Sequence, residues 1–201
     1  MKLSRPRCPG DEGLPGAELS LEPAWLPRVQ ADALLERLRR EIPWETHRIR
    51  MFGREVDSPR LSCWIGDEDA AYTYSGTRFE PRPWPAPLLA VRQRLARELE
   101  IGFNSALANL YRSGRDAMGW HSDDERELGP EPVIASLSLG AARRFVLKSR
   151  HDPTLKREFV LPHGSLLIMA GQTQRHYRHC LPRTAKPTGE RINLTFRQVL
   201  A

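Results

Sequence analysis

The chain has few cysteines and no long apolar segment, and both shortages limit what it can be. Its 201 residues include only three cysteines, Cys8, Cys63 and Cys180. An odd and scattered set argues against a framework of disulfides and favours a reducing compartment. No apolar run approaches the roughly 18 residues of a membrane-spanning helix, and the first residues lack the apolar centre of a secretion signal. We therefore expect a cytoplasmic protein that does not enter a membrane.

The composition is that of a folded domain, with 40% hydrophobic and 28% charged residues. A chain of this length can bury a sizeable core as a single unit, and it contains no internal repeat. Residues 1–18 are rich in proline and glycine. We therefore predict a flexible N-terminal arm over 1–18 and a single domain over 19–201.

The net charge is positive, at +6 with a pI near 9.6, and arginine supplies most of it. Arginine can hold phosphate groups with two parallel hydrogen bonds and displace their counterions, so a basic balance suggests a polyanionic partner such as nucleic acid. The alternative is that the source proteome is arginine-rich throughout. Charge alone leaves both explanations open.

The pattern of apolar residues changes from helical to strand-like along the chain. Residues 30–42 and the stretch between Pro85 and Gly102 place apolar side chains at helical spacing, and Pro43 ends the first of them. Short alternating runs follow at 132–140, 143–149, 157–161, 164–171 and 190–199. Two helices followed by many short strands predict a mainly β (α+β) fold, a sandwich or jelly-roll with helices packed on one side.

The segment MGWHSDD contains a histidine and an aspartate two residues apart, His121 and Asp123. If it is a strand, both side chains project from one face and can share a metal ion. A third ligand must then come from downstream, where His163, His176 and His179 are the candidates. Two histidines and one carboxylate suit non-haem Fe(II). The alternative is a solvated acidic loop that happens to contain a histidine.

The segment RINLTFR alternates polar and apolar residues. One face would carry Arg191, Asn193, Thr195 and Arg197, and the other Ile192, Leu194 and Phe196. If the polar face points inward, its two arginines suit a small dicarboxylate; an edge strand with a charged outer face is the alternative. Asn109 and Tyr111 are also two apart, so both can face the same cavity.

Four segments together resemble a known family. They are NLYRSGRDAMGWHSDDERELG, IASLSLGAARRFVLK, HGSLLIMAGQTQRHYRHCLP and RINLTFR. In this order they resemble the AlkB family of Fe(II)/2-oxoglutarate dioxygenases over about residues 51–199, closest in look to its eukaryotic-type DNA-repair and RNA-demethylating branches. The resemblance implies a double-stranded β-helix (jelly-roll) core at about 104–200 and a nucleotide-recognition lid at about 44–84.

The resemblance also implies site residues. Iron would be held by His121, Asp123 and His179, because the family's distal histidine directly precedes a CLP-like segment; His176 is then expected to be structural. The 2-oxoglutarate pocket would consist of Asn109, Tyr111, Arg191, Asn193, Thr195 and Arg197. In the family the first arginine of this strand pairs with the far carboxylate, and the second lies near the iron.

The substrate contacts that the resemblance implies lie mostly in the lid. They are Phe52, Tyr72, Tyr74, Ser75, Asp124 and Glu125. Phe52 would be a wedge in the base stack, although a buried phenylalanine in a hairpin is the alternative. Tyr74 would stack on the base, and Asp124 and Glu125 would meet its exocyclic amine. For Arg60, Arg143, Arg144, Lys148 and Arg150 a solvated basic face is expected, with contact to phosphate groups as the alternative.

The activity that the resemblance implies is direct-reversal repair. With Fe(II), O2 and 2-oxoglutarate, bases such as 1-methyladenine and 3-methylcytosine would be oxidatively demethylated in DNA, with RNA as a second candidate, releasing formaldehyde, succinate and CO2. We expect a monomer, near the nucleoid in a bacterium or in the nucleus of a eukaryote. Two alternatives stay open: a hydroxylase of a non-nucleic-acid substrate and a non-catalytic nucleic-acid-binding protein.

Overall fold

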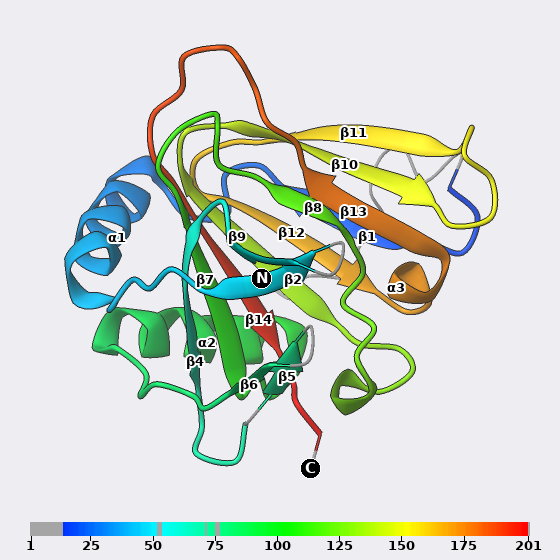
Figure 1. Ribbon diagram of the computed structural model, residues 1–201. Helices are drawn as coiled ribbons and strands as arrows, with labels where there is room; N and C mark the ends of the chain where they lie inside the picture. The colour runs from blue at the N-terminus through cyan, green and yellow to red at the C-terminus, as the bar shows by residue number, and fades with distance from the viewer. Residues whose placement is uncertain (1–13, 52–53, 71, 75–76, 201) are drawn as a thin grey trace.

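The computed structural model describes residues 14–51, 54–70, 72–74 and 77–200, without the side chains of 48–51, 54–55, 72–74 and 77–79. Eighteen elements lie in these ranges (Figure 1). In chain order they are β1 (Glu18–Glu22), α1 (Arg28–Glu41), β2 (Arg48–Met51), β3 (Arg54–Asp57), β4 (Leu61–Gly66), β5 (Tyr72–Tyr74), β6 (Thr77–Phe79), α2 (Ala86–Leu99), β7 (Ser105–Tyr111), β8 (Met118–His121), η1 (Arg126–Leu128), β9 (Ile134–Gly140), β10 (Arg143–Ser149), β11 (Lys156–Leu161), β12 (Ser165–Ala170), α3 (Thr173–His176), β13 (Tyr177–Leu181) and β14 (Arg191–Arg197).

Two antiparallel sheets form the centre of the molecule. The larger has the strand order β1-β12-β9-β14-β7-β4, and the smaller has the order β11-β10-β13-β8. Two further hairpins, β2–β3 and β5–β6, lie in the region predicted to be the lid. In Figure 1 the smaller sheet lies to one side of the larger one, with α1 and α2 on the other. This arrangement confirms the predicted mainly β jelly-roll with helices packed on one side.

The two long helices cover the outer face of the larger sheet. In α1 the buried residues are Ala31, Leu34 and Leu38, which share one side at helical spacing. They join a core cluster with Leu194 and Phe196 of β14. Pro43 follows the last turn of α1, as predicted, and α2 ends where Glu100 adopts a left-handed conformation (φ 58°). Both predicted helices are therefore present, within a few residues of their expected ends.

Both faces of the larger sheet are buried, so its strands are not simply amphipathic. A second core cluster fills the space between the two sheets and includes Ile134 of β9, Phe145 and Leu147 of β10, and Leu167 of β12. All seven residues of β14 are buried. Because the polar face of β14 points toward the second sheet, the alternation in RINLTFR separates a core face from a polar face inside the jelly-roll.

The domain extends beyond the limits predicted for its parts. Leu14 is buried and the Pro15 carbonyl accepts a hydrogen bond from the Tyr177 hydroxyl at 2.9 Å, so the end of the predicted arm packs on the core. Strand β1 pairs with β12, and β4, inside the predicted lid range, pairs with β7. Strands on both sides of residue 50 thus complete a sheet that we expected to begin near residue 104.

Among the residues that the structure describes, no helix is long and apolar enough to cross a membrane.

Candidate metal and cosubstrate site

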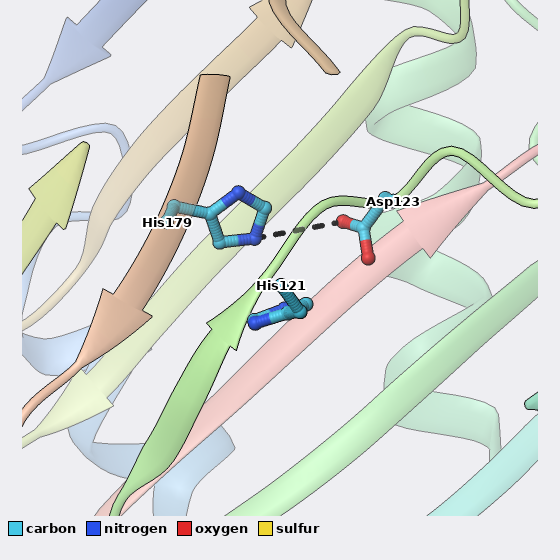
Figure 2. Close-up of side chains that lie close together, drawn as sticks. All are labelled: His121, Asp123 and His179. Atoms are coloured by element: carbon cyan, nitrogen blue, oxygen red, sulfur yellow. Dashed lines mark ion pairs between the residues drawn. The ribbon is translucent and has the colours of Figure 1, made fainter. Parts of the chain in front are cut away.

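Three potential metal ligands meet at one end of the smaller sheet. His121 is the last residue of β8, and His179 lies directly opposite it on β13. Their ring centroids are 4.2 Å apart, and His179 Nε2 lies 4.0 Å from Asp123 Oδ2 (Figure 2). One ligand atom from each of the three residues lies within 4.8 Å of the others. The structure therefore brings together the three residues named as metal ligands.

Asp123 reaches this cluster by a different route from the one expected. Strand β8 ends at His121, so Asp123 lies in the loop beyond and does not share a strand face with His121. Its backbone N–H donates to Gln174 Oε1 at 3.0 Å, and its Oδ1 accepts a hydrogen bond from Arg197 Nη2 at 2.7 Å. Gln174 on α3 therefore holds the backbone of Asp123 and Arg197 on β14 holds its carboxylate, as a neighbouring strand would otherwise do.

The two imidazoles are arranged as neutral ligands. His121 Nδ1 lies 2.9 Å from the Gly119 carbonyl; because a carbonyl only accepts, the proton belongs on Nδ1, which leaves the Nε2 lone pair for a metal. Burial, helped by the neighbouring His121, lowers the pKa of His179 to about 3. Burial likewise lowers the pKa of His121. Both rings are thus neutral near pH 7, as metal ligation requires.

The aspartate is charged at the same pH. Burial acts to raise the pKa of Asp123, but the Arg197 guanidinium and the two imidazoles outweigh it and lower the pKa to about 2. Asp123 Oδ2 is buried and has no hydrogen-bond partner in the described part of the chain. A buried carboxylate oxygen in that state is unfavourable unless something else satisfies it. Two neutral imidazoles and a carboxylate fit non-haem Fe(II), and an ion among them would satisfy this oxygen.

A polar cavity adjoins the three ligands and extends between the sheets. Its lining includes all three metal candidates and the six residues predicted for 2-oxoglutarate: Asn109, Tyr111, Arg191, Asn193, Thr195 and Arg197. Asn109 and Tyr111 come from β7, which pairs with β14 so that Arg191 lies opposite Tyr111 and Asn193 opposite Asn109. The cavity floor is therefore two adjacent strands whose polar faces coincide.

Arg191 lies in this cavity as a deeply buried cation. It is 2% exposed, its Nη2 donates to Ser138 Oγ at 2.9 Å, and its guanidinium lies 5.3 Å from the centre of the Tyr111 ring. Its Nε and Nη1 have no hydrogen-bond partner in the described ranges. Burial lowers the pKa of Arg191 to about 10, so it stays charged at neutral pH. The unsatisfied donors fit a carboxylate, which can accept two parallel hydrogen bonds.

The other polar side chains of the cavity are held in fixed orientations. Asn193 Nδ2 donates to Ser136 Oγ at 2.9 Å and to the Leu137 carbonyl at 3.0 Å. Thr195 Oγ1 donates to Asn193 Oδ1 at 3.3 Å. Ser136 and Ser138 were not among the predicted residues. The alternation of IASLSLG could have revealed them, because its serines share the strand face opposite Ala135, Leu137 and Leu139.

Arg60 is a second contributor that the sequence did not reveal. We expected a solvated basic residue, but Arg60 is 5% exposed, and its Nε donates to Asn109 Oδ1 at 2.7 Å. Arg60 therefore holds the side chain of Asn109, which lines the cavity. No local pattern in SPRLS marks this contact, because its partner lies 49 residues away.

The prediction that Arg143 lies on a solvated basic face is also wrong. It is 3% exposed, and its guanidinium donates to the carbonyls of Ser113, Asp116 and Pro182 at 3.2, 3.0 and 2.8 Å. The loop before β8 and the segment after β13 are thereby joined. Arg143 thus connects the two strands that carry His121 and His179.

The other three basic residues have exposed or partly exposed partners. Arg144 pairs with Glu158 at 3.2 Å, Lys148 lies 4.9 Å from the centre of the Trp120 ring, and Arg150 pairs with Asp124. Arg144 and Arg150 are thus exposed and Lys148 is half-buried, as expected of a basic face, and Arg150 also holds the loop that carries Asp123 through Ser122 and Asp124.

Only some of the predicted substrate contacts belong to the residues whose side chains the structure describes. Phe52 and Ser75 lie outside the described residues, and Tyr72 and Tyr74 belong to β5, whose backbone alone is described. Asp124 is ion-paired with Arg150. Glu125 directly precedes η1. Asp124 and Glu125 lie beside the metal cluster but are not among the described residues that line the cavity.

Comparison with known proteins identifies the group to which this site belongs. Residues 18–197 match the model of the 2OG-Fe(II) oxygenase superfamily. The alpha-ketoglutarate-dependent dioxygenase alkB homolog 3 of Bos taurus is 37% identical over 217 residues, which cover 98% of this chain and 74% of the relative. The DNA oxidative demethylase ALKBH2 of Homo sapiens is 38% identical, covering 86% of this chain and 70% of the relative.

A solved structure agrees with the fold. The structure of OsALKBH1 superimposes with a TM-score of 0.60 at 17% identity and covers 90% of this chain and 97% of that one. The AlkB resemblance of the four segments is thus confirmed, and with it the expected Fe(II), 2-oxoglutarate and O2 chemistry. The chain belongs to the AlkB group of the 2OG-Fe(II) oxygenase superfamily and is an Fe(II)/2-oxoglutarate-dependent dioxygenase.

Proposed function

We propose that the protein removes N-linked methyl groups from damaged bases in DNA, with 1-methyladenine and 3-methylcytosine as its substrates. The observation that carries this proposal is the cluster of His121, Asp123 and His179 beside a cavity, in a chain 37–39% identical to dioxygenases and DNA demethylases of the AlkB group. The net charge of +6 supports a polyanionic substrate. Both lesions lie on the edge of the base that pairs, which weakens pairing and makes the base easier to extrude.

The proposed roles follow from where the side chains lie. His121, Asp123 and His179 would hold Fe(II) through Nε2, Oδ2 and Nε2 respectively. Arg191 would bind the far carboxylate of 2-oxoglutarate through Nε and Nη1, with Tyr111 against its guanidinium. Arg197 would act near the metal, because it already donates to Asp123 Oδ1 at 2.7 Å.

Asn109, Asn193 and Thr195 would complete the cosubstrate pocket. Their hydrogen bonds to Arg60, Ser136 and one another hold them in place before 2-oxoglutarate binds, which lowers the entropy lost on binding. When bound, iron and 2-oxoglutarate would supply the oxidation by O2, in which one oxygen atom enters the succinate formed with CO2 from the cosubstrate and the other converts the N-methyl group to a hydroxymethyl group that leaves as formaldehyde. The protein's own task is to position the methyl carbon and to exclude bulk water.

The lid is proposed to be the region of about 44–84, where the hairpins β2–β3 and β5–β6 lie. We propose Phe52 as a wedge that fills the gap left by the extruded base. Tyr72, Tyr74 and Ser75 would line the base pocket, and Asp124 and Glu125 would face a base made cationic by methylation. Such an enzyme belongs with cellular DNA, in the nucleoid or the nucleus, and we propose that it acts as a monomer.

The direct test is demethylation of a single lesion. The purified protein with Fe(II), 2-oxoglutarate and an oligonucleotide carrying one 1-methyladenine should restore adenine, as seen by mass spectrometry, and form succinate, while an H179A variant should do neither. Duplex DNA, single-stranded DNA and RNA are compared side by side. Activity on RNA alone would overturn the choice of DNA, and cosubstrate turnover without methyl loss on any nucleic acid would overturn the proposal.

The wedge has its own test on the same substrates. Phe52→Ala should slow repair of the duplex far more than repair of the single strand, because only the duplex leaves a gap in a base stack. Equal losses on both would show a core residue.

A further inference from the structure

The loop between the two proximal metal ligands is held by side chains from other elements. Strand β8 ends at His121, so Asp123 has no neighbouring strand to receive its N–H. Ser122 Oγ donates to the Tyr177 carbonyl at 2.8 Å and accepts a hydrogen bond from Arg150 Nη2 at 2.7 Å. The N–H of Asp123 donates a hydrogen bond to Gln174 Oε1 at 3.0 Å. Gln174 is therefore the residue that holds the backbone of the carboxylate ligand itself.

The Gln174 amide has one defined orientation. The side chain is 1% exposed, and its Nε2 donates to the Met169 sulfur at 3.6 Å. Because the Asp123 N–H can only donate, the carbonyl oxygen of Gln174 must face it. Met169, which lines the cavity, receives the NH2 group on the other side. The amide is thus fixed at both ends without contact with solvent.

The short helix α3 that carries Gln174 is itself anchored. Thr173 Oγ1 donates to the Ala170 carbonyl at 2.6 Å and accepts the Glu18 N–H at 2.8 Å. Helix α3 runs directly into β13, which carries His179. Gln174 consequently connects the element that precedes one metal ligand to the backbone of another. A shift of Gln174 would change the distance between Asp123 Oδ2 and His179 Nε2.

We propose that Gln174 is a positioning residue for the metal site and sets its affinity and geometry through the hydrogen bond from the Asp123 N–H. The proposal rests on the metal site of the proposed function. Without an acceptor at Oε1, the buried N–H of Asp123 is left unsatisfied, and the loop moves to find a partner. Substitution of a residue that hydrogen-bonds to a metal ligand and orients it commonly lowers metal affinity by about 10- to 100-fold.

The test is metal binding in the absence of substrate and oxygen. Co(II) is titrated into the metal-free protein, and its visible absorption reports both affinity and ligand geometry. Gln174→Met keeps the length of the side chain but lacks the amide acceptor, and we expect Co(II) to bind about 10- to 100-fold more weakly with an altered spectrum. Gln174→Glu keeps an acceptor oxygen at the same reach. Because the position is 1% exposed, we expect its carboxyl to be protonated, with the O–H toward the Met169 sulfur, so its spectrum and affinity should stay close to those of the wild-type protein.

His176→Ala is the matched control, because His176 lies on the same short helix but is hydrogen-bonded to Gln172 and not to the Asp123 backbone. It should leave the Co(II) affinity and spectrum unchanged. The proposal is overturned if Q174M binds Co(II) like the wild-type protein, if Q174E binds as weakly as Q174M, or if H176A weakens binding as much as Q174M. A wild-type protein that binds no Co(II), or an H179A variant that binds it normally, would instead overturn the metal site.

Discussion

A single buried arginine, Arg191, gives the proposed cosubstrate cavity its positive charge. The guanidinium of Arg191 has Ser138 Oγ as one neutral acceptor and the Tyr111 ring beside it. A buried cation is unfavourable when its donors are unsatisfied, so the free protein holds a charge for which the cosubstrate carboxylate is the natural counterion. The unsatisfied donors of Arg191 thereby lower the stability of the free protein, and cosubstrate binding would satisfy them.

Replacing Arg191 by lysine should therefore damage binding more than folding. Lysine keeps the charge but cannot present two parallel donors to one carboxylate. Losing a charged hydrogen bond removes about 1.5–3 kcal/mol, which corresponds to a rise of roughly 10- to 100-fold in the KM for 2-oxoglutarate. Arg144→Lys is the control, since Arg144 pairs with Glu158 at the surface. An unchanged KM for the R191K variant would show that Arg191 does not hold the cosubstrate.

The two histidines of QRHYRHC should behave in opposite ways. His179 faces Asp123, whereas His176 Nε2 is hydrogen-bonded to Gln172 Oε1 at 2.8 Å on the far side of the turn. His179→Ala should remove metal binding and activity, and His176→Ala should keep both. Iron content after anaerobic reconstitution measures the difference. Loss of iron from the His176 variant but not from the His179 variant would reverse the ligand assignment.

At the level of elements, β14 has two faces with separate tasks. Ile192, Leu194 and Phe196 are fully buried in the cluster beneath the helices. The other face forms the cavity floor with β7. Since the side-chain period of a strand is two, neighbouring residues along β14 should affect different properties of the protein.

Leu194→Ala and Thr195→Ala test this division. The first removes a fully buried side chain and should lower the free energy of unfolding by about 2–5 kcal/mol. The second removes one hydroxyl and one methyl group and should lower it by only about 1–2 kcal/mol while weakening 2-oxoglutarate binding. Denaturant titration and the KM for 2-oxoglutarate give the two readouts. Equal stability losses, with equal effects on KM, would contradict the division into faces.

At the level of the whole molecule, the metal site depends on the closure of two sheets. His121 and His179 come from the smaller sheet, while Arg191 and Arg197 come from the larger one. Arg143 ties together the loops at the far ends of β8 and β13. The site is thus assembled only when the whole jelly-roll is folded, and ionisation within it is coupled to global stability.

The metal-free protein should therefore lose stability as the pH falls below about 6.5. The pKa of His179 is about 3 in the folded protein and roughly 6.5 when unfolded, so the unfolded state binds more protons between these values. Asp123, with a pKa of about 2, adds a loss of the same sign below about 4. Each group contributes at most about 1.4 kcal/mol per pH unit within its window.

Denaturant titrations over a pH series measure this slope. A His179→Gln variant should show a shallower fall in unfolding free energy between pH values of about 6 and 4. His121 and other groups would keep the slope from vanishing. A variant with the full wild-type slope would mean that His179 is not neutral in the folded protein.

Much of this protein could be predicted from local patterns. The apolar spacing of 30–42 and the alternation of RINLTFR depend only on the periods of helix and strand, so the sequence alone determined α1, β14 and the face of β14 that carries Arg191 and Arg197. The grouping of His121, Asp123 and His179 was expected from the family resemblance, and the structure brings ligand atoms of the three side chains within 4.8 Å of one another.

What only the tertiary structure decided are the contacts between segments far apart in the chain. No periodic pattern in the sequence marks these contacts. They include the position of Asp123 off the strand, the hydrogen bonds of Gln174 and Arg60, the burial of Arg143 and the addition of β1 and β4 to the larger sheet. The physical reason is that such contacts depend on which strands become neighbours when the two sheets close. Sequence thus determined which side chains face the cavity, and the fold determined what holds them there.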